Sequence, residues 1–160
     1  MKYLWAPWRM EYIEAPKSDR CIFCLPDRDQ DDRERLVLCR GEKSFVIMNR
    51  YPYSNGHLMV APFRHVADLE YLKPEEMAEM HNLLVKCRKV LGRAMAPQGF
   101  NVGMNLGEVA GAGIADHLHL HIVPRWMGDT NFMPVFSDTR VVPQHLEETF
   151  KILAKEFASV

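Results

Sequence analysis

Three histidines alternate with apolar residues in the run HLHLHIV at residues 117–123. If this run is a β-strand, alternate side chains project from opposite faces, so His117, His119 and His121 share one face and the apolar residues face the core. Three neighbouring imidazoles are costly as purely structural residues, because protonating them together near neutral pH causes repulsion. The pattern therefore indicates a functional site rather than a packing motif.

Two kinds of chemistry fit three imidazoles on one face. In the first, the three histidines form a metal cage with one open coordination position, as in a catalytic zinc hydrolase. In the second, one imidazole is a nucleophile, while its neighbours orient it, bind a metal or contact phosphate. The triad by itself leaves both readings open.

A pair of cysteines bears on this choice. Cys21 and Cys24 form a C-x-x-C, which supplies two thiolates, and a closed structural zinc site needs two further ligands. The candidates are His65, in a loop after the third expected strand, and His117, at the head of the triad. If both bind the metal, the zinc site is closed and His119 remains available for chemistry.

The elements that must position these residues follow from apolar periodicity. Short apolar runs at 36–40, 44–49 and 56–62 predict antiparallel strands, and further strands are expected at 100–106 and 117–123. A long helix is expected from Pro74 to Ala96 and a second helix near the C-terminus. Strands, a helical crossover and more strands together predict an α+β domain with a mainly antiparallel sheet.

Two details of this prediction concern packing and exposure. The buried stripe of the long helix is expected to consist of Met77, Met80, Leu84, Cys87 and Leu91. The strongly charged stretch at 26–35 is expected to be a solvated loop. One domain should span residues 1–160, with an N-terminal extension at 1–35 that carries the C-x-x-C, a core at 36–128 and a C-terminal extension at 129–160.

Charge and hydropathy narrow the class of partners. The formal net charge is −1, so no general field attracts nucleic acid or an anionic membrane. No apolar run reaches the roughly 20 residues that span a bilayer. The first residues lack the continuous apolar segment of a secretion signal, so a cytoplasmic location is expected. In a reducing compartment, the isolated Cys39 and Cys87 are expected to pack as small apolar residues.

The run HLHLHIVPRW resembles the signature of the histidine-triad superfamily, and FVIMNRYPYSNGHLMVAPFRHV is similar to that family's strand–turn–strand. The resemblance covers roughly residues 21–129. It implies that His119 is the nucleophile, with His117 and His121 as its flanking histidines. It also implies a zinc site built from two cysteines and two histidines, which correspond to Cys21, Cys24, His65 and His117. Iron is the alternative metal, because thiolates and imidazoles accept both ions.

The resemblance further implies how a nucleotide binds. Asn49 corresponds to an Asn at the nucleoside ribose, and His57 and Asn105 correspond to residues near the phosphates. The chemistry of the site adds His121, Asn105 and the backbone amides of residues 111–113, including Gly111 and Gly113, as groups that stabilise charge on phosphate oxygens. Many family members carry Gln and then Ser or Thr just before the triad, whereas this chain has Gly113 and Ile114 there.

The implied reaction is attack of His119 on an α-phosphate to give a covalent nucleotidyl-histidine, which a second acceptor resolves. The segments LWAPWRMEYI and PRWMGDTNFMPV resemble the branch that contains diadenosine tetraphosphate phosphorylases. Water and orthophosphate both remain possible acceptors. Two other functions stay open: a nucleotide-sensing module with little turnover, and a zinc-stabilised interaction domain.

A homodimer is also implied, because the family pairs subunits through a sheet that continues across a twofold axis. Residues 99–106 follow the long helix and are short and apolar, as expected of an edge strand that needs covering. The expected partners are therefore a small nucleotide and a second copy of the chain, with no nucleic acid and no membrane.

Overall fold

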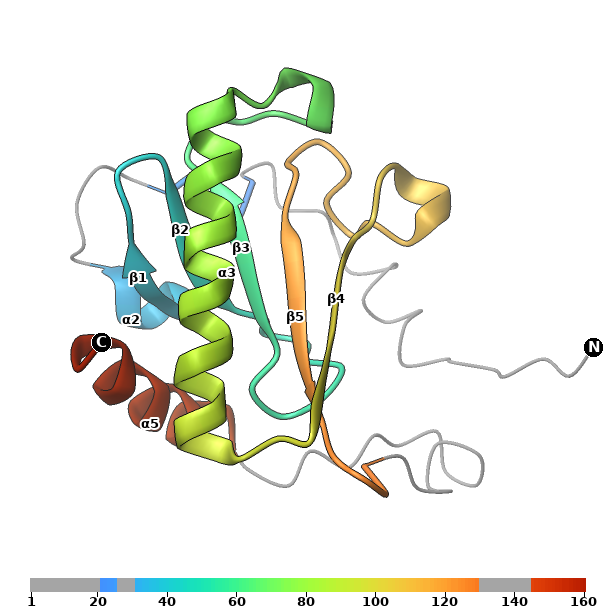
Figure 1. The fold of residues 1–160 in the computed structure, drawn as a ribbon. Helices are drawn as coiled ribbons and strands as arrows, with labels where there is room; N and C mark the ends of the chain where they lie inside the picture. Colours follow the sequence, from blue (N-terminus) through green and yellow to red (C-terminus); the bar gives the residue numbers. More distant parts are fainter. Residues whose placement is uncertain (1–20, 26–30, 130–144) are drawn as a thin grey trace, which may run out of the picture.

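The computed structural model describes residues 21–25, 31–129 and 145–160 (Figure 1). Its centre is a five-stranded antiparallel sheet in the order β1-β2-β3-β5-β4. This architecture confirms the predicted α+β class. The strands are β1 (Val37–Arg40), β2 (Ser44–Met48), β3 (Leu58–Pro62), β4 (Gly99–Met104) and β5 (Leu120–Arg125).

Helices pack on one face of the sheet. The long helix α3 (Pro74–Met95) runs along the strands, and α5 (Leu146–Ala158) lies beside its C-terminal half (Figure 1). Two short 3-10 turns, η2 (Leu69–Tyr71) and η3 (Glu108–Ala110), lie in the connections. Within the described residues, no helix is long and apolar enough to cross a membrane.

The charged stretch before β1 differs from its prediction. The short helix α2 (Asp32–Arg35) replaces the expected loop over its last residues, and Leu36 ends it in the left-handed conformation at φ 63°. Arg40 holds α2 against β1 through a two-pronged contact with Asp32, whose oxygens lie 2.7–3.1 Å from the guanidinium nitrogens. Residues 1–20, 26–30 and 130–144 lie outside the described residues, so expectations for them stay untested.

Apolar side chains fill both faces of the central strands. Every residue of β2 and β3 is buried, which explains why their sequences are continuous apolar runs rather than alternating ones. One face packs against α3 and α5, and the other carries a smaller cluster around Phe23 and Phe45. The cluster under the helices comprises Val46, Met48, Leu58, Val60, Met80, Leu83, Cys87, Val90, Leu91, Ile122, Phe150, Leu153 and Phe157.

The buried stripe of α3 is rotated from the predicted one at its start. Met77 is 49% exposed, and Glu76 takes the buried position in the first turn because its carboxylate binds Arg64. Further along, Leu83 and Val90 join the predicted Met80, Cys87 and Leu91, while Leu84 is only partly buried. Glu76, paired with the partly exposed Arg64, thus takes a buried position for which apolar periodicity alone favoured Met77.

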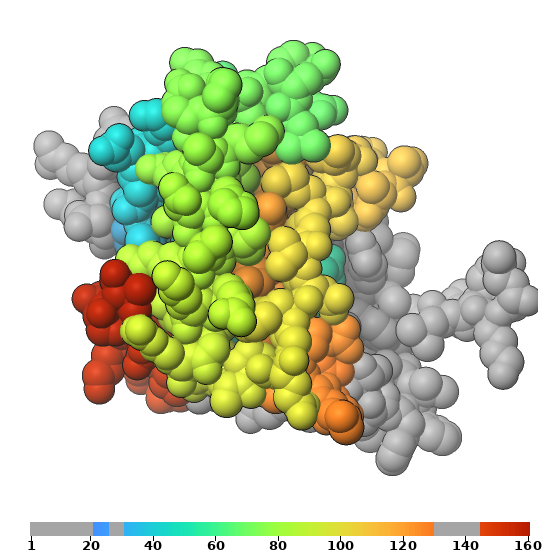
Figure 2. Space-filling view, viewed as in Figure 1, coloured from blue at the N-terminus to red at the C-terminus, as the bar shows by residue number. Residues whose placement is uncertain are grey.

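β4 lies at the edge of the sheet, as predicted. Among the described strands it pairs with β5 alone, and it ends at Met104, before the expected Leu106. In the space-filling view α3 and α5 cover the central strands, whereas the chain that follows α3 lies at the surface (Figure 2). The side chain of Val102 on this strand is 51% exposed. An apolar edge of this kind is available for pairing with another strand.

The buried carboxylate of Glu76 gives a prediction about acid stability. Hydrogen bonds from Arg64, together with the Lys73 backbone N–H, lower the pKa of Glu76 to about 2 against an ordinary 4.5. A pKa lowered by folding stabilises the native state fully above about pH 4.5, and this contribution is lost as the pH falls toward 2. Glu76→Gln should lower the free energy of unfolding at pH 7 by roughly 1–3 kcal/mol. Urea titrations should show the difference from wild type shrinking between pH 5 and pH 2.5; a constant difference would contradict this.

Candidate active site

The three triad histidines lie on the sheet face opposite the helices. His121 is paired directly with Met59 on β3, and directly opposed side chains in an antiparallel ladder share a face. Met59 belongs to the cluster around Phe23. The ring of Phe23 lies 5.3 Å from His117 and 4.6 Å from His119, and the rings of His119 and His121 are 4.8 Å apart. The predicted shared face of the imidazoles is therefore confirmed.

β5 begins later than the alternation predicted. The ladder to β3 and β4 starts at Leu120, so His117 and His119 lie in the segment just before the strand. There the backbone N–H of Leu118 donates to the carbonyl of Val66 at 2.6 Å, outside the ladder. This shift frees the carbonyl of His117 for a side-chain contact.

His119 uses that carbonyl. Its Nδ1 lies 2.8 Å from the backbone oxygen of His117, and because a carbonyl only accepts, Nδ1 must carry the proton. In the neutral ring the lone pair then lies on Nε2. His119 is 6% exposed, and burial lowers its pKa, which keeps the ring neutral at neutral pH. The result is an oriented imidazole whose unprotonated Nε2 is chemically able to act as a nucleophile.

A second chain of hydrogen bonds fixes His121. The backbone N–H of Tyr53 donates to Nδ1 of His57 at 3.1 Å, and the Asn49 amide lies 3.3 Å from the same atom. Since Nδ1 of His57 accepts, Nε2 carries the proton and donates to Nδ1 of His121 at 2.9 Å. His121 must therefore be protonated on Nε2. Burial, with a smaller effect from His119, lowers the pKa of His121 to about 4.

The Nε2–H of His121 is buried and has no hydrogen-bond partner among the described residues. A buried unsatisfied donor is rare and costly unless something binds it. Beside the lone pair of His119, it provides a donor for an anionic oxygen of a bound group. The two histidines thus hold opposite states: Nε2 of His119 is an acceptor and Nε2 of His121 is a donor, and two separate sets of hydrogen bonds fix these states.

His117 faces a different set of groups. Its Nε2 donates to the Pro62 carbonyl at 2.9 Å, which leaves the lone pair on Nδ1, 3.4 Å from Sγ of Cys21 and 3.8 Å from Sγ of Cys24. Nδ1 of His65 lies 3.2 Å from Sγ of Cys24. All four ligand atoms lie within 4.8 Å of one another. Burial, with lesser effects from His65 and His119, lowers the pKa of His117 to about 4, so its Nδ1 is free of a proton.

These four residues fit a metal ion. Ligands about 2.0–2.3 Å from a tetrahedral zinc are separated by roughly 3.3–3.8 Å, close to the observed contacts. Two thiolates and two imidazoles close the coordination shell, and the group includes neither His119 nor His121. The arrangement supports a closed structural site and speaks against the triad as a catalytic metal cage.

Two aromatic residues of the site, Phe23 and Tyr53, were not predicted from the sequence. Phe23, between the two cysteines, is 1% exposed and packs on His119, so the loop formed by residues 21–24 (the cysteine loop) directly supports the His119 ring. Tyr53 stacks on His57 at 4.8 Å between ring centroids, with 26° between the planes. The sequence offered only weak indications of their roles: Phe23 is an apolar residue inside the C-x-x-C, and Tyr53 is an aromatic residue shortly before the Asn-Gly turn.

Asn49 and His57 border a pocket. Oδ1 of Asn49 accepts the backbone N–H of Tyr51 at 2.9 Å, which fixes the side chain beside His57. The pocket has a volume of about 360 Å³ and is lined also by Arg50 and by His145 at the start of α5. His145 is exposed, and its ring also caps α5 by accepting the Glu147 N–H. The contact of Asn49 with a ribose remains a prediction.

Hydrogen bonds fix the backbone of the loop at residues 105–113, which contains Gly107, Gly111 and Gly113. Nδ2 of Asn105 donates to the Gly111 carbonyl at 3.1 Å, and Gly111 adopts a left-handed φ of 89°. The amides of Gly111 and Ala112 donate to the carbonyls of Glu108 and Gly107 inside the η3 turn. Gly113 is exposed. Phosphate binding by Asn105, Gly111 and Gly113 therefore stays a prediction, and the first two now have a structural role as well.

A model of the HIT (histidine triad) domain family matches residues 30–127. The chain belongs to this family. It is 43% identical to the AP-4-A phosphorylase of Mycobacterium tuberculosis over 166 residues, which covers 99% of this chain and 85% of that protein. It is 30% identical to the asymmetrical bis(5'-nucleosyl)-tetraphosphatase of Schizosaccharomyces pombe over 112 residues, or 70% of this chain and 58% of that protein.

The fold comparison agrees with the sequence comparison. A zinc-bound histidine triad family protein from Mycobacterium smegmatis superposes with a TM-score of 0.66 at 25% identity, over 87% of this chain and 94% of that one. The resemblance read from the triad is therefore confirmed at the level of the family and the fold. In this HIT chain, the unprotonated Nε2 of His119 and the unsatisfied Nε2–H of His121 suit a nucleotide hydrolase or transferase.

Proposed function

We propose that this HIT enzyme, a nucleotide hydrolase or transferase, cleaves dinucleoside polyphosphates through a covalent nucleotide on His119. One observation carries the proposal: Nδ1–H of His119 is bound to the His117 carbonyl, which leaves Nε2 as a nucleophile beside the unsatisfied Nε2–H of His121. The 43% identity to an AP-4-A phosphorylase over nearly the whole chain supports the substrate class.

The first step forms one bond and breaks another. The lone pair on Nε2 of His119 attacks an α-phosphorus, a P–N bond forms, and the P–O bond to the remaining polyphosphate breaks with its electron pair. The ring becomes an imidazolium, and its Nδ1–H bond to the His117 carbonyl strengthens as the positive charge develops. Nε2–H of His121 donates to a non-bridging oxygen that gains negative charge in the transition state.

In the second step an acceptor attacks the same phosphorus from the opposite side. The P–N bond breaks, its electrons return to Nε2, neutral His119 is restored, and the proton that the acceptor loses passes to solvent. Water as acceptor releases a nucleoside monophosphate, and orthophosphate releases a nucleoside diphosphate. No chemical step needs a metal at the cluster of Cys21, Cys24, His65 and His117. Zinc bound there would act by fixing the cysteine loop and His117 in place.

Product analysis tests the proposal and identifies the acceptor. Purified protein is incubated with diadenosine tetraphosphate, with and without orthophosphate, and the nucleotides are separated. ATP with phosphate-dependent ADP marks a phosphorylase, whereas ATP with AMP in both samples marks a hydrolase. Tight binding of the dinucleotide with no product in either sample would reject the enzyme and favour the nucleotide-sensing alternative.

We also propose a homodimer that forms through β4. This strand lies at the edge of the sheet and exposes Val102, so pairing with β4 of a second copy would extend the sheet across a twofold axis. Light scattering at micromolar concentration should return twice the chain mass of 18.5 kDa. Val102→Lys should shift the protein toward monomer, while Val85→Lys, on the exposed face of α3, should not. A wild-type mass near that of one chain would reject the dimer.

A further inference from the structure

The segment at residues 62–66, directly after β3, meets the triad at three points. The Pro62 carbonyl accepts Nε2–H of His117, and the Val66 carbonyl accepts the backbone N–H of Leu118 at 2.6 Å. Between them, His65 supplies one of the four clustered metal ligands. This segment therefore sets the position of His65 and also the tautomer of His117.

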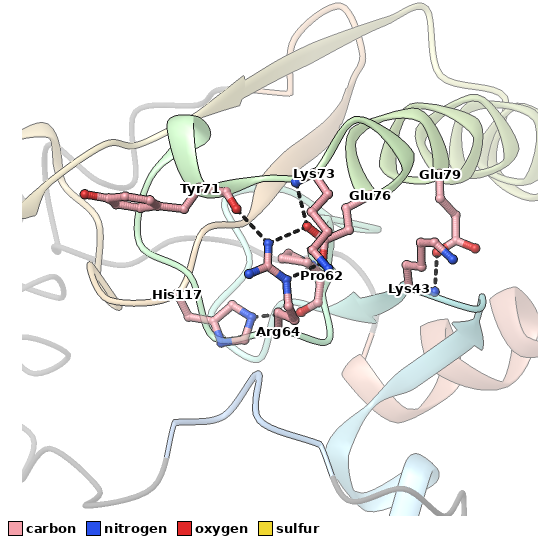
Figure 3. Close-up of polar contacts among 8 residues, drawn as sticks. All are labelled: Lys43, Pro62, Arg64, Tyr71, Lys73, Glu76, Glu79 and His117. Carbon is pink, nitrogen blue, oxygen red and sulfur yellow. Dashed lines mark hydrogen bonds and ion pairs between the residues drawn. The ribbon is translucent and has the colours of Figure 1, made fainter.

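Arg64, at the centre of the same segment, points toward Glu76 at the start of α3 (Figure 3). Its Nε donates to Oε1 of Glu76 at 2.6 Å and its Nη2 to Oε2 at 2.7 Å, which makes a two-pronged ion pair. Nη2 also donates to the Tyr71 carbonyl at 2.6 Å. The guanidinium thus joins the segment to two elements that hold no metal ligand.

Glu76 is a rigid anchor. It lies in the first turn of the 22-residue helix α3, its side chain is 5% exposed, and Oε2 also accepts the Lys73 backbone N–H at 2.8 Å (Figure 3). A planar guanidinium bound at two points to a fixed carboxylate defines direction as well as distance, which a lysine cannot do.

We propose that Arg64 and Glu76 are positioning residues, which clamp residues 62–66 to α3 and so hold His65 and His117 in the geometry that binds the metal. The clamp acts on the nucleophile indirectly, because the His117 carbonyl orients His119. The inference rests on the proposed metal site. Residues that orient metal ligands from outside the coordination shell typically change metal affinity by about 10- to 100-fold when they are removed.

A second ion pair provides a matched control. Arg125 makes the same two-pronged contact with Asp129, at the opposite end of β5 from His117. The exposed side-chain fractions are 44% and 12% for this pair, against 43% and 5% for Arg64 and Glu76. If the clamp contributed only general stability, removing either arginine would have similar consequences for the metal site.

Zinc affinity, measured by competition with a chelator, separates these possibilities. Arg64→Met, Arg64→Lys and Glu76→Gln should each weaken zinc binding by about tenfold or more, while Arg125→Met stays within about twofold of wild type. Glu76→Gln preserves shape and keeps the test valid if Arg64→Met fails to fold. Affinities of the folded Arg64 and Glu76 variants within twofold of wild type would overturn the clamp.

Imidazole NMR of the metal-free protein gives a readout that does not depend on zinc. In wild type and in Arg125→Met, His117 should show one tautomer protonated on Nε2, and Glu76→Gln should show exchange between tautomers. An unchanged His117 signal in Glu76→Gln would overturn the clamp. Wild-type protein that binds no zinc would instead reject the metal site, and the NMR comparison would then decide the clamp alone.

Discussion

Substituting His119 with Asn is expected to lower kcat on diadenosine tetraphosphate by on the order of 10³-fold or more, because the two-step route through the imidazole is lost. The side-chain amide of Asn occupies nearly the same space as the part of the imidazole ring next to Cβ. Its nitrogen can still donate to the His117 carbonyl, so the fold should survive. Zinc content and affinity for the dinucleotide should stay close to wild type. Steady-state kinetics, elemental analysis and equilibrium binding measure the three quantities.

His81→Asn is the matched control for this substitution. His81 is exposed on α3, away from the triad, so the same chemical change there should leave kcat unaltered. Ordinary turnover by the His119 variant would show that another group attacks the phosphorus. An unchanged kcat with a raised KM and an equal loss of dinucleotide affinity would show that His119 acts in binding rather than as a nucleophile.

Loss of the metal site is expected to have the second-largest effect. Cys21→Ser removes one of four clustered ligands and should abolish tight zinc binding, with a fall of several kcal/mol in the free energy of unfolding. Cys39→Ser is the control, because Cys39 is partly buried like Cys21 but belongs to no metal cluster among the described residues. This substitution should lower the free energy of unfolding by about 1 kcal/mol. Elemental analysis and urea unfolding give both numbers.

In Cys21→Ser, activity should fall together with the metal content, because the contacts that hold His119 and His117 in place are lost. Without the cysteine loop, Phe23 no longer supports His119 and His117 loses its partners. Equal effects of the two cysteine substitutions on stability would contradict the structural metal site. So would carefully purified wild-type protein that contains neither zinc nor iron.

The shared face of the triad was predictable because the side-chain period of an extended chain is two, whether or not a ladder has formed. The start of β5 was not, because it depends on where β3 and β4 pair with it and on the contact between Leu118 and Val66, which lies far away in sequence. Likewise, C-x-x-C and two histidines predicted a ligand set, whereas only the fold shows which ring nitrogen of His117 faces the thiolates.

Pairs of charged residues were the least predictable feature. Glu76 stands beside Glu75 and close to Lys73, and the sequence gives no reason to pair it with Arg64 rather than expose both side chains. Their pairing buries Glu76 and turns Met77 outward, against the apolar periodicity of α3. Phe23 was missed for a related reason: two adjacent apolar residues between the cysteines, Ile22 and Phe23, have no periodicity to show which of them is buried.

The stereochemical course at the α-phosphorus tests the nucleophile most directly. A dinucleoside tetraphosphate made chiral by sulfur at the α-phosphorus is converted with orthophosphate, or with isotopically labelled water if water is the acceptor, and the configuration of the product is determined. Two in-line displacements, the first by His119 and the second by the acceptor, predict overall retention of configuration. Inversion would mean a single direct attack by the acceptor and would contradict a covalent nucleotide on His119.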